Sequence, residues 1–226
     1  MKGFSTIFLT VSGVLYVALG VNVLVTLTTF PVWALGLLVD IRKSWVALAI
    51  VFPLLGPAIA GAYTVFRDYS DDGSTSVVRT FFRGWRRTAS RALPIALLVD
   101  AVGVVAAVDV VGMGFGTTAL GTLMLPVGVV AVVLALLTAS LALTAVVDTP
   151  ALRRRDALKL GLVRAVRSPL TSLVTLAVGG MLTFFLVKGV SYALAFALSP
   201  VLYVTWANSR YALGGTWGPK APADRA

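Results

Sequence analysis

Residues 119–147 read ALGTLMLPVGVVAVVLALLTASLALTAVV, and this stretch decides the fold class. It contains no charged residue and exceeds the roughly 20 residues that a helix needs to cross the hydrocarbon core of a bilayer. Lipid offers no partners to backbone N–H and C=O groups, whereas a helix satisfies those groups within one segment. We therefore predict a transmembrane helix here.

Five other apolar segments accompany it, which predicts an all-α, polytopic membrane protein with about six transmembrane helices in one bundle over residues 1–213. The composition agrees, because 58% of the residues are hydrophobic and 12% are charged, against about a quarter charged in soluble domains. Pro31 is expected to kink or end the first segment. The tail 214–226, rich in Gly, Pro and Ala, is predicted to be disordered. The six segments are 5–38, 45–66, 92–110, 119–147, 170–188 and 190–207.

The distribution of positive charge predicts the topology. Sixteen of the 19 Lys and Arg residues lie at the N-terminus, in the 67–91 and 148–168 loops, or in the C-terminal tail. Cytoplasmic segments carry such an excess of Lys and Arg. We expect both termini and both basic loops to lie in the cytoplasm. Whether 31–44 crosses the membrane fully or re-enters stays open. The three residues on the other side are Arg42, Lys43 and Lys188.

The residue types that are absent restrict the chemistry. The chain has no Cys and no His, and its nine acidic residues are all Asp. These absences remove thiolate nucleophiles, imidazole bases and the usual zinc and haem ligands. We predict that the protein is not an enzyme and holds no cofactor or metal. The net charge of +10 lies beside apolar segments, so we expect contact with anionic lipid headgroups rather than nucleic acid.

Residues 76–92 form the sharpest local pattern. On a helical wheel the apolar side chains fall on one side and the arginines on the other, which is typical of a helix lying in the membrane interface. Asp71 and Asp72 precede the segment and suit a helix N-terminus. Two interpretations stay open, a passive interfacial helix and a docking surface for a cytoplasmic partner. The interfacial and docking candidates are Arg79, Phe82, Arg83, Trp85, Arg86, Arg87 and Arg91.

A second basic segment, 153–167, follows Asp148-Thr149-Pro150, which is expected to cap its start. Small residues at four-residue spacing, such as Gly103 with Ala107, are expected to let helix backbones approach closely. Both patterns are interpreted as structural, although the second basic helix also belongs to the expected docking surface.

Two polar residues fall inside predicted transmembrane segments. Asp100 lies nine residues past Arg91, or about 13 Å along a helix, and is expected near mid-bilayer. A charged group there costs about 2.5–3.5 kcal/mol, so we expect Asp100 to face the interior and find partners. Asn22 is a plausible partner. Structural hydrogen bonding and a role in proton or substrate movement both stay open.

Several short motifs resemble the YesL-type family of bacterial membrane proteins. The first pair is Asn22-Val23-Leu24 with Thr29-Phe30-Pro31-Val32, and the second is Gly56-Pro57-Ala58 with Ala62-Tyr63. Arg67, Phe81-Phe82 and Trp85-Arg86 are similar to the family's basic loop. The resemblance implies a bacterial plasma membrane protein with no established activity and no catalytic residues. It also implies an accessory role near carbohydrate ABC importers.

The sequence therefore leaves two functions open. The first is a non-enzymatic membrane protein that assists or regulates carbohydrate uptake, with importer permease or ATPase subunits as partners. The alternative is a small transporter or channel in its own right, with Asp100 and Asn22 lining a polar path.

Overall fold

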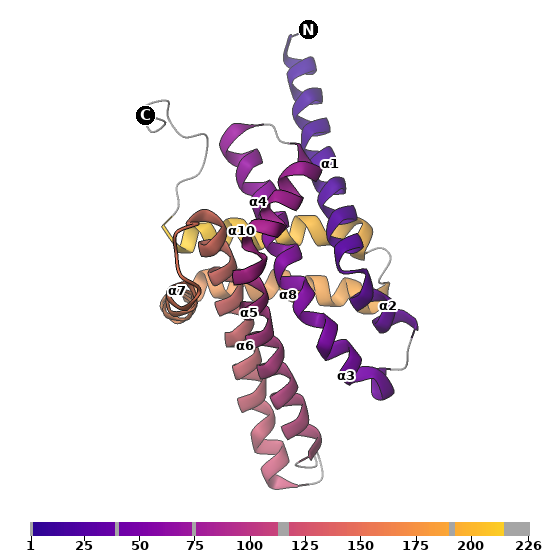
Figure 1. Ribbon diagram of the computed structural model, residues 1–226, viewed down its shortest axis with the longest axis vertical. Coiled ribbons are helices and arrows are strands. Elements are labelled where there is room, and N and C mark those ends of the chain that lie inside the picture. Colours follow the sequence, from indigo (N-terminus) through magenta and orange to yellow (C-terminus); the bar gives the residue numbers. More distant parts are fainter. Residues whose placement is uncertain (1, 39–40, 74–75, 113–117, 190–192, 215–226) are drawn as a thin grey trace.

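The computed structural model describes residues 2–38, 41–73, 76–112, 118–189 and 193–214 (Figure 1). These residues are almost entirely helical, and no strand occurs among them. Five helical segments in this part of the chain are long and apolar enough to cross a membrane. The all-α, polytopic fold predicted from the sequence is thereby confirmed. The five segments are Val11–Thr28, Trp45–Asp72, Val77–Asp109, Met124–Asp148 and Pro169–Leu186.

The first predicted segment, 5–38, is divided in two. Helix α1 (Lys2–Thr28) ends just before Thr29, and α2 (Phe30–Leu38) follows with Pro31 in its first turn. Proline lacks the N–H that would continue the helix, as the sequence led us to expect. The buried Thr29 hydroxyl donates to the Val25 carbonyl at 2.6 Å and accepts from Trp33 Nε1 at 2.8 Å. Side-chain hydrogen bonds thus accompany the break.

The second predicted segment, 45–66, falls on three elements. They are α3 (Ile41–Val51), a 3-10 turn η1 (Phe52–Leu54) around Pro53, and α4 (Leu55–Asp72). Helix α4 ends at Gly73, whose φ of 73° lies in the left-handed region that favours glycine. Its N–H donates to the Tyr69 carbonyl at 2.9 Å. The side chains of Arg42 and Lys43 lie outside the described part of the chain.

Helix α5 (Val77–Gly112) differs from the sequence interpretation. It runs without a break through Pro94, so the predicted basic helix 76–92 and the predicted third segment 92–110 are one helix. Its 36 residues correspond to about 54 Å at 1.5 Å per residue. A single straight helix cannot lie in the membrane plane and cross the membrane at once. The arginine-rich half of α5 instead packs along α4 (Figure 1).

The remaining helices are arranged in two directions. Helix α6 (Ala119–Asp148) runs antiparallel to α5, and α7 (Arg154–Arg167) packs against α6. Helix α8 (Pro169–Lys188) and α10 (Leu198–Ala212) lie across the α5–α6 pair (Figure 1). A short π-helix, η2 (Ala193–Ala197), leads directly into α10. The predicted sixth segment, 190–207, therefore starts outside the described residues and ends within α10.

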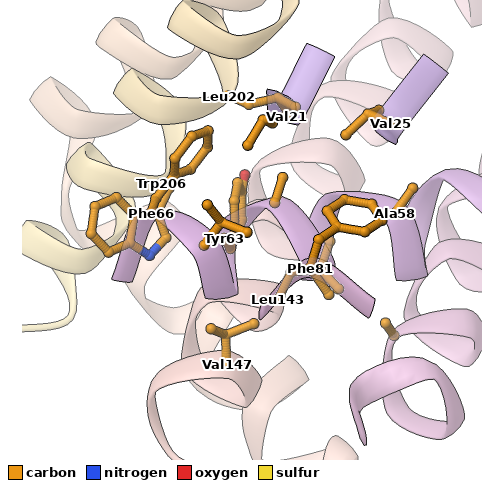
Figure 2. Close-up of a cluster of buried hydrophobic side chains, with 14 of the residues drawn as sticks. Val21, Val25, Ala58, Tyr63, Phe66, Phe81, Leu143, Val147, Leu202 and Trp206 are labelled. Atoms are coloured by element: carbon orange, nitrogen blue, oxygen red, sulfur yellow. The ribbon is translucent and has the colours of Figure 1, made fainter. Parts of the chain in front are cut away.

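The core takes its buried residues from six helices, α1, α4, α5, α6, α7 and α10, and Figure 2 shows part of it. Tyr63 of α4 lies in the middle of the cluster, and Phe66 of α4 packs at one side of it beside the fully buried Trp206 of α10. The Phe66 and Trp206 rings are 6.1 Å apart between centroids, a distance at which aromatic pairs add to packing. The other labelled contributors are Val21 and Val25 of α1, Ala58 of α4, Phe81 of α5, Leu143 and Val147 of α6, and Leu202 of α10.

Outside this core, large apolar side chains are exposed. The C-terminal half of α5 and the N-terminal half of α6 project together from the core (Figure 1). Helix α8 carries exposed apolar residues on several sides. Exposing so much apolar surface to water is unfavourable, whereas the tails of membrane lipids can cover it. Examples are Leu97, Leu98, Val105, Val127, Val130, Leu170, Leu173, Met181 and Phe184.

Candidate functional site

Charged side chains gather where the C-terminal half of α4 packs against the first half of α5. Here α4, the first half of α5 and the end of α6 surround a small cavity of about 160 Å³, which we call the arginine pocket. It is the meeting point of residues that lie far apart in the sequence. The lining residues are Thr64, Arg67, Asp68, Arg83, Gly84, Arg87, Thr88, Val146, Val147 and Pro150.

Glycine and threonine residues set the shape of this pocket. A Cβ on Gly84 would overlap the Thr64 side chain, so the absence of a side chain lets α4 and α5 approach closely. The Thr64 hydroxyl donates to the Ala60 carbonyl at 2.9 Å, and the Thr88 hydroxyl donates to the Gly84 carbonyl at 2.7 Å. Both hydroxyl protons are therefore used within their own helices. The remaining strong donors in the lining are the arginines.

Asp68 lies between two of these arginines. Its carboxylate is 3.2 Å from Arg67 Nη2 and 3.7 Å from Arg83 Nη2. Arg67 also donates to the Val147 carbonyl at 2.5 Å, which fixes its guanidinium against the C-terminal end of α6. Arg83 is the more exposed partner, with 61% of its side chain accessible to solvent. Arg87 is exposed and makes no hydrogen bond or ion pair with any described residue.

Two further arginines tie elements together around the pocket. Arg91 donates to the Pro150 carbonyl at 2.5 Å, joining α5 to the α6–α7 connection. Arg210 of α10 contacts Asp71 of α4 at 3.0 Å and lies 3.9 Å from Asp148 of α6. Its guanidinium also lies over the Trp206 ring, 5.3 Å from the centroid, and only 11% of the side chain is exposed. These arginines have structural roles.

The docking candidates from the sequence separate into two groups. Arg83 and Arg87 line the pocket, and Arg91 contacts the α6–α7 connection. Arg79 and Arg86 point to solvent, exposed and without an ion pair to any described residue. The two aromatic candidates differ from each other. Trp85 packs against the core, whereas Phe82 stays 36% exposed beside Phe81.

The apolar face predicted for 76–92 is also placed differently. Phe81 and Ala92 are fully buried, but against α4 rather than toward lipid, and Val78 is 55% exposed. The buried face of α5 is made of small and hydroxyl-bearing residues together with Phe81. The wheel missed it because Gly and Thr do not count as apolar. Its members are Val77, Thr80, Phe81, Gly84, Thr88, Ala92 and Ile95.

Helix α7 adds a second basic surface. Its buried side consists of Ala157, Gly161 and Ala165, and a Cβ on Gly161 would lie 2.6 Å from the Thr138 carbonyl oxygen. Small residues therefore hold α7 close to α6 while its opposite side faces outward. The exposed basic residues, which form no ion pair with a described residue, are Arg154, Arg155, Lys159, Arg164 and Arg167.

The two intramembrane candidates lie in different surroundings. Asn22 is buried, and its Oδ1 accepts the Ser199 N–H at 2.6 Å where η2 passes into α10. This bond supplies an acceptor next to a π-helical segment, where regular helical bonding is interrupted. Asp100 is half-buried on α5 and makes no hydrogen bond or ion pair with a described residue. The hydrogen-bond partner that the sequence led us to expect for Asp100 is thus not found among the described residues.

Sequence reasoning missed the partners of the arginines. The local pattern assigns Asp71 to the start of a helix, but this residue lies in the last turn of α4 and pairs with Arg210. The local pattern likewise makes Asp148 a cap, but it is the last residue of α6 and lies toward the same arginine. Partners so far apart in the sequence leave no local signal. Within the described residues no group of three or more acidic side chains gathers to hold a metal.

The arrangement is suited to binding anions. It offers three guanidinium groups against one carboxylate, that of Asp68, which lies between Arg67 and Arg83. Among known proteins, a family model described as a protein of unknown function, DUF624, matches residues 18–110. No curated protein and no solved structure matches. The matched stretch contains every motif on which the YesL-type resemblance depends, and it is over this stretch that the chain is similar to the DUF624 family.

Proposed function

We propose that this protein is a non-enzymatic subunit that assists or regulates a carbohydrate ABC importer in the bacterial plasma membrane. One observation carries the proposal. The basic residues divide into two sets. The inner set holds the fold together and consists of Arg67, Arg91 and Arg210. The outer set has no partner among the described residues and consists of Arg79 and Arg86 of α5 and Arg154, Arg155, Lys159, Arg164 and Arg167 of α7. Structural ion pairs do not account for the outer set.

The outer set is presented rigidly, which favours recognition of a partner. Arg79 and Arg86 project from a helix whose other side is packed on α4, and α7 is held to α6 by Gly161. The helix backbones need no reordering on binding, so the conformational cost is limited to the basic side chains, about 0.5–1.5 kcal/mol for each one immobilised. An acidic surface on a permease or ATPase subunit is the complement that such a patch would recognise. The positive-inside rule puts this end of the bundle in the cytoplasm.

The test is purification in mild detergent from cells grown on different sugars, with mass spectrometry of the proteins that co-elute. We expect importer subunits in stoichiometric amounts with the wild type. The double variant Arg79→Gln/Arg86→Gln should lose them, because it removes the two outward-facing charges that α5 contributes to the surface. Lys188→Gln, on α8, is the control and should retain them. Absence of any partner under all growth conditions would contradict the proposal.

A stand-alone transporter or channel is the second candidate. It needs Asp100 and Asn22 to line a shared polar path. Asn22 Oδ1 is engaged by the Ser199 N–H, and the groove beside Asn22 is otherwise lined almost entirely by apolar residues of α1, α2 and η2. Asp100 does not line that groove. A flux in liposomes that Asp100→Asn abolishes would favour this candidate over the accessory role.

A further inference from the structure

The arginine pocket contains more positive than negative charge. Three guanidinium groups and one carboxylate line it, so two positive charges are uncompensated at neutral pH. Asp68 is already shared between Arg67 and Arg83. Arg87 lines the same cavity without a partner in the described part of the chain. Guanidinium groups converging on a cavity are the usual means of binding phosphate.

The cavity is also large enough for such a group. Its volume of about 160 Å³ is several times the roughly 30 Å³ that one water occupies. Thr64 and Thr88 use their hydroxyl protons within their own helices, so the donors available to a ligand are guanidinium N–H groups. An anion with several oxygens matches this donor set better than a neutral sugar, whose hydroxyls also need acceptors.

We propose that the arginine pocket binds a phosphate group through Arg83 and Arg87, with Arg67 held behind them by Asp68 and Val147. The pocket begins at Thr64 and Arg67, where the apolar part of α4 gives way to charged residues. This position suits the phosphate of an anionic lipid headgroup, and the same donors suit the phosphate of a soluble molecule. The proposal does not depend on the accessory function, which rests on the outward-facing arginines.

The test uses the full-length protein purified in a neutral detergent. Binding of inorganic phosphate and of short-chain dioctanoyl phosphatidylglycerol is measured separately by native mass spectrometry and by the shift in thermal unfolding. We expect saturable binding of at least one of the two probes. Phosphatidylglycerol binding without phosphate binding identifies a lipid headgroup site, and binding of inorganic phosphate identifies a site for free phosphate.

Matched variants on one helix separate the pocket from general electrostatic attraction. Arg83→Gln/Arg87→Gln should weaken binding of the probe at least tenfold, whereas Arg79→Gln/Arg86→Gln removes the same charge outside the pocket and should change it less than twofold. Arg87→Gln alone should also weaken binding, and it breaks no contact with a described residue, so loss of fold is not expected. Equal weakening by the two double variants, or no saturable binding of either probe, would overturn the proposal.

Discussion

Gly84 shows how a single residue positions the arginine pocket. A side chain there would overlap Thr64, so α4 and α5 would have to separate and the pocket would change shape. A Cβ added at Gly103, later on the same helix, would meet nothing within 4 Å, although the spacing of Gly103 from Ala107 indicates close packing. Spacing alone does not distinguish a glycine at a helix contact from one that faces open space.

Gly84→Ala is therefore expected to destabilise the protein. Overpacking of a close helix contact costs about 1–3 kcal/mol. Gly103→Ala is the matched control and should be neutral or stabilising by up to about 1 kcal/mol, because alanine favours helix over glycine. The free energy of unfolding, measured by detergent denaturation of each variant, checks both. Equal stability of the two variants would mean that α4 and α5 are not held together at Gly84.

Asn22 is the second residue whose role can be tested. Asn22→Leu should cost about 1–3 kcal/mol, because the buried Ser199 N–H would lose its acceptor. Val23→Leu, at the neighbouring exposed position of the same helix, is the control and should leave the free energy of unfolding unchanged. If Asn22→Leu unfolds at the same denaturant concentration as the wild type, the bond contributes nothing to stability.

For Asp100 we expect the opposite effect on stability, because removing its charge should not destabilise the protein. It is a half-buried carboxylate on an apolar helix, with no partner in the described part of the chain. Asp100→Asn should leave the free energy of unfolding unchanged or raise it, since a charged group in the membrane is costly. A loss of more than about 1 kcal/mol, the size of a typical hydrogen bond, would show that the carboxylate has a partner in the folded protein.

At the scale of elements, Arg210 joins three helices. It connects α10 to Asp71 of α4 and lies toward Asp148 of α6, and its guanidinium covers Trp206. Replacing it with Met should cost about 1.5–3 kcal/mol, the range for hydrogen bonds to charged groups. Arg79→Met, at an exposed position without a described partner, should cost little. Faster proteolysis after α10 in Arg210→Met than in Arg79→Met would show that the C-terminal helix is loosened.

The extent of α5 marks the limit of what local patterns predict. Its charge and apolar periodicity correctly indicated a helix over 76–92, and the apolar run after it correctly indicated another helical segment. Their continuity depends on Pro94 being tolerated inside the helix and on α4 covering the buried side of the basic half. Those contacts involve residues that no sequence window contains together. The pocket could not be predicted for the same reason.

For the molecule as a whole, composition and apolar segments predicted the all-α membrane fold well. Hydropathy needs no tertiary information, because each segment meets lipid individually. The division of 5–38 at Thr29 was anticipated from Pro31. The crossing of α8 and α10 over the α5–α6 pair was not, because relative helix direction depends on packing (Figure 1). The pairing of arginines with carbonyls and carboxylates depends on the same packing.

We propose that the arginine-rich end of the bundle is a cytoplasmic docking surface for importer subunits, and crosslinking tests this proposal most directly. The chain has no native cysteine, so a single cysteine placed at Arg86 can be crosslinked in intact cells without background from the protein itself. A second cysteine variant at Val129, exposed on the projecting part of α6, is the control. We predict a crosslinked product containing an importer permease or ATPase subunit from position 86 and none from position 129. Crosslinking from neither position, or equally from both, would rule out a docking surface for importer subunits at the arginine-rich end of the bundle.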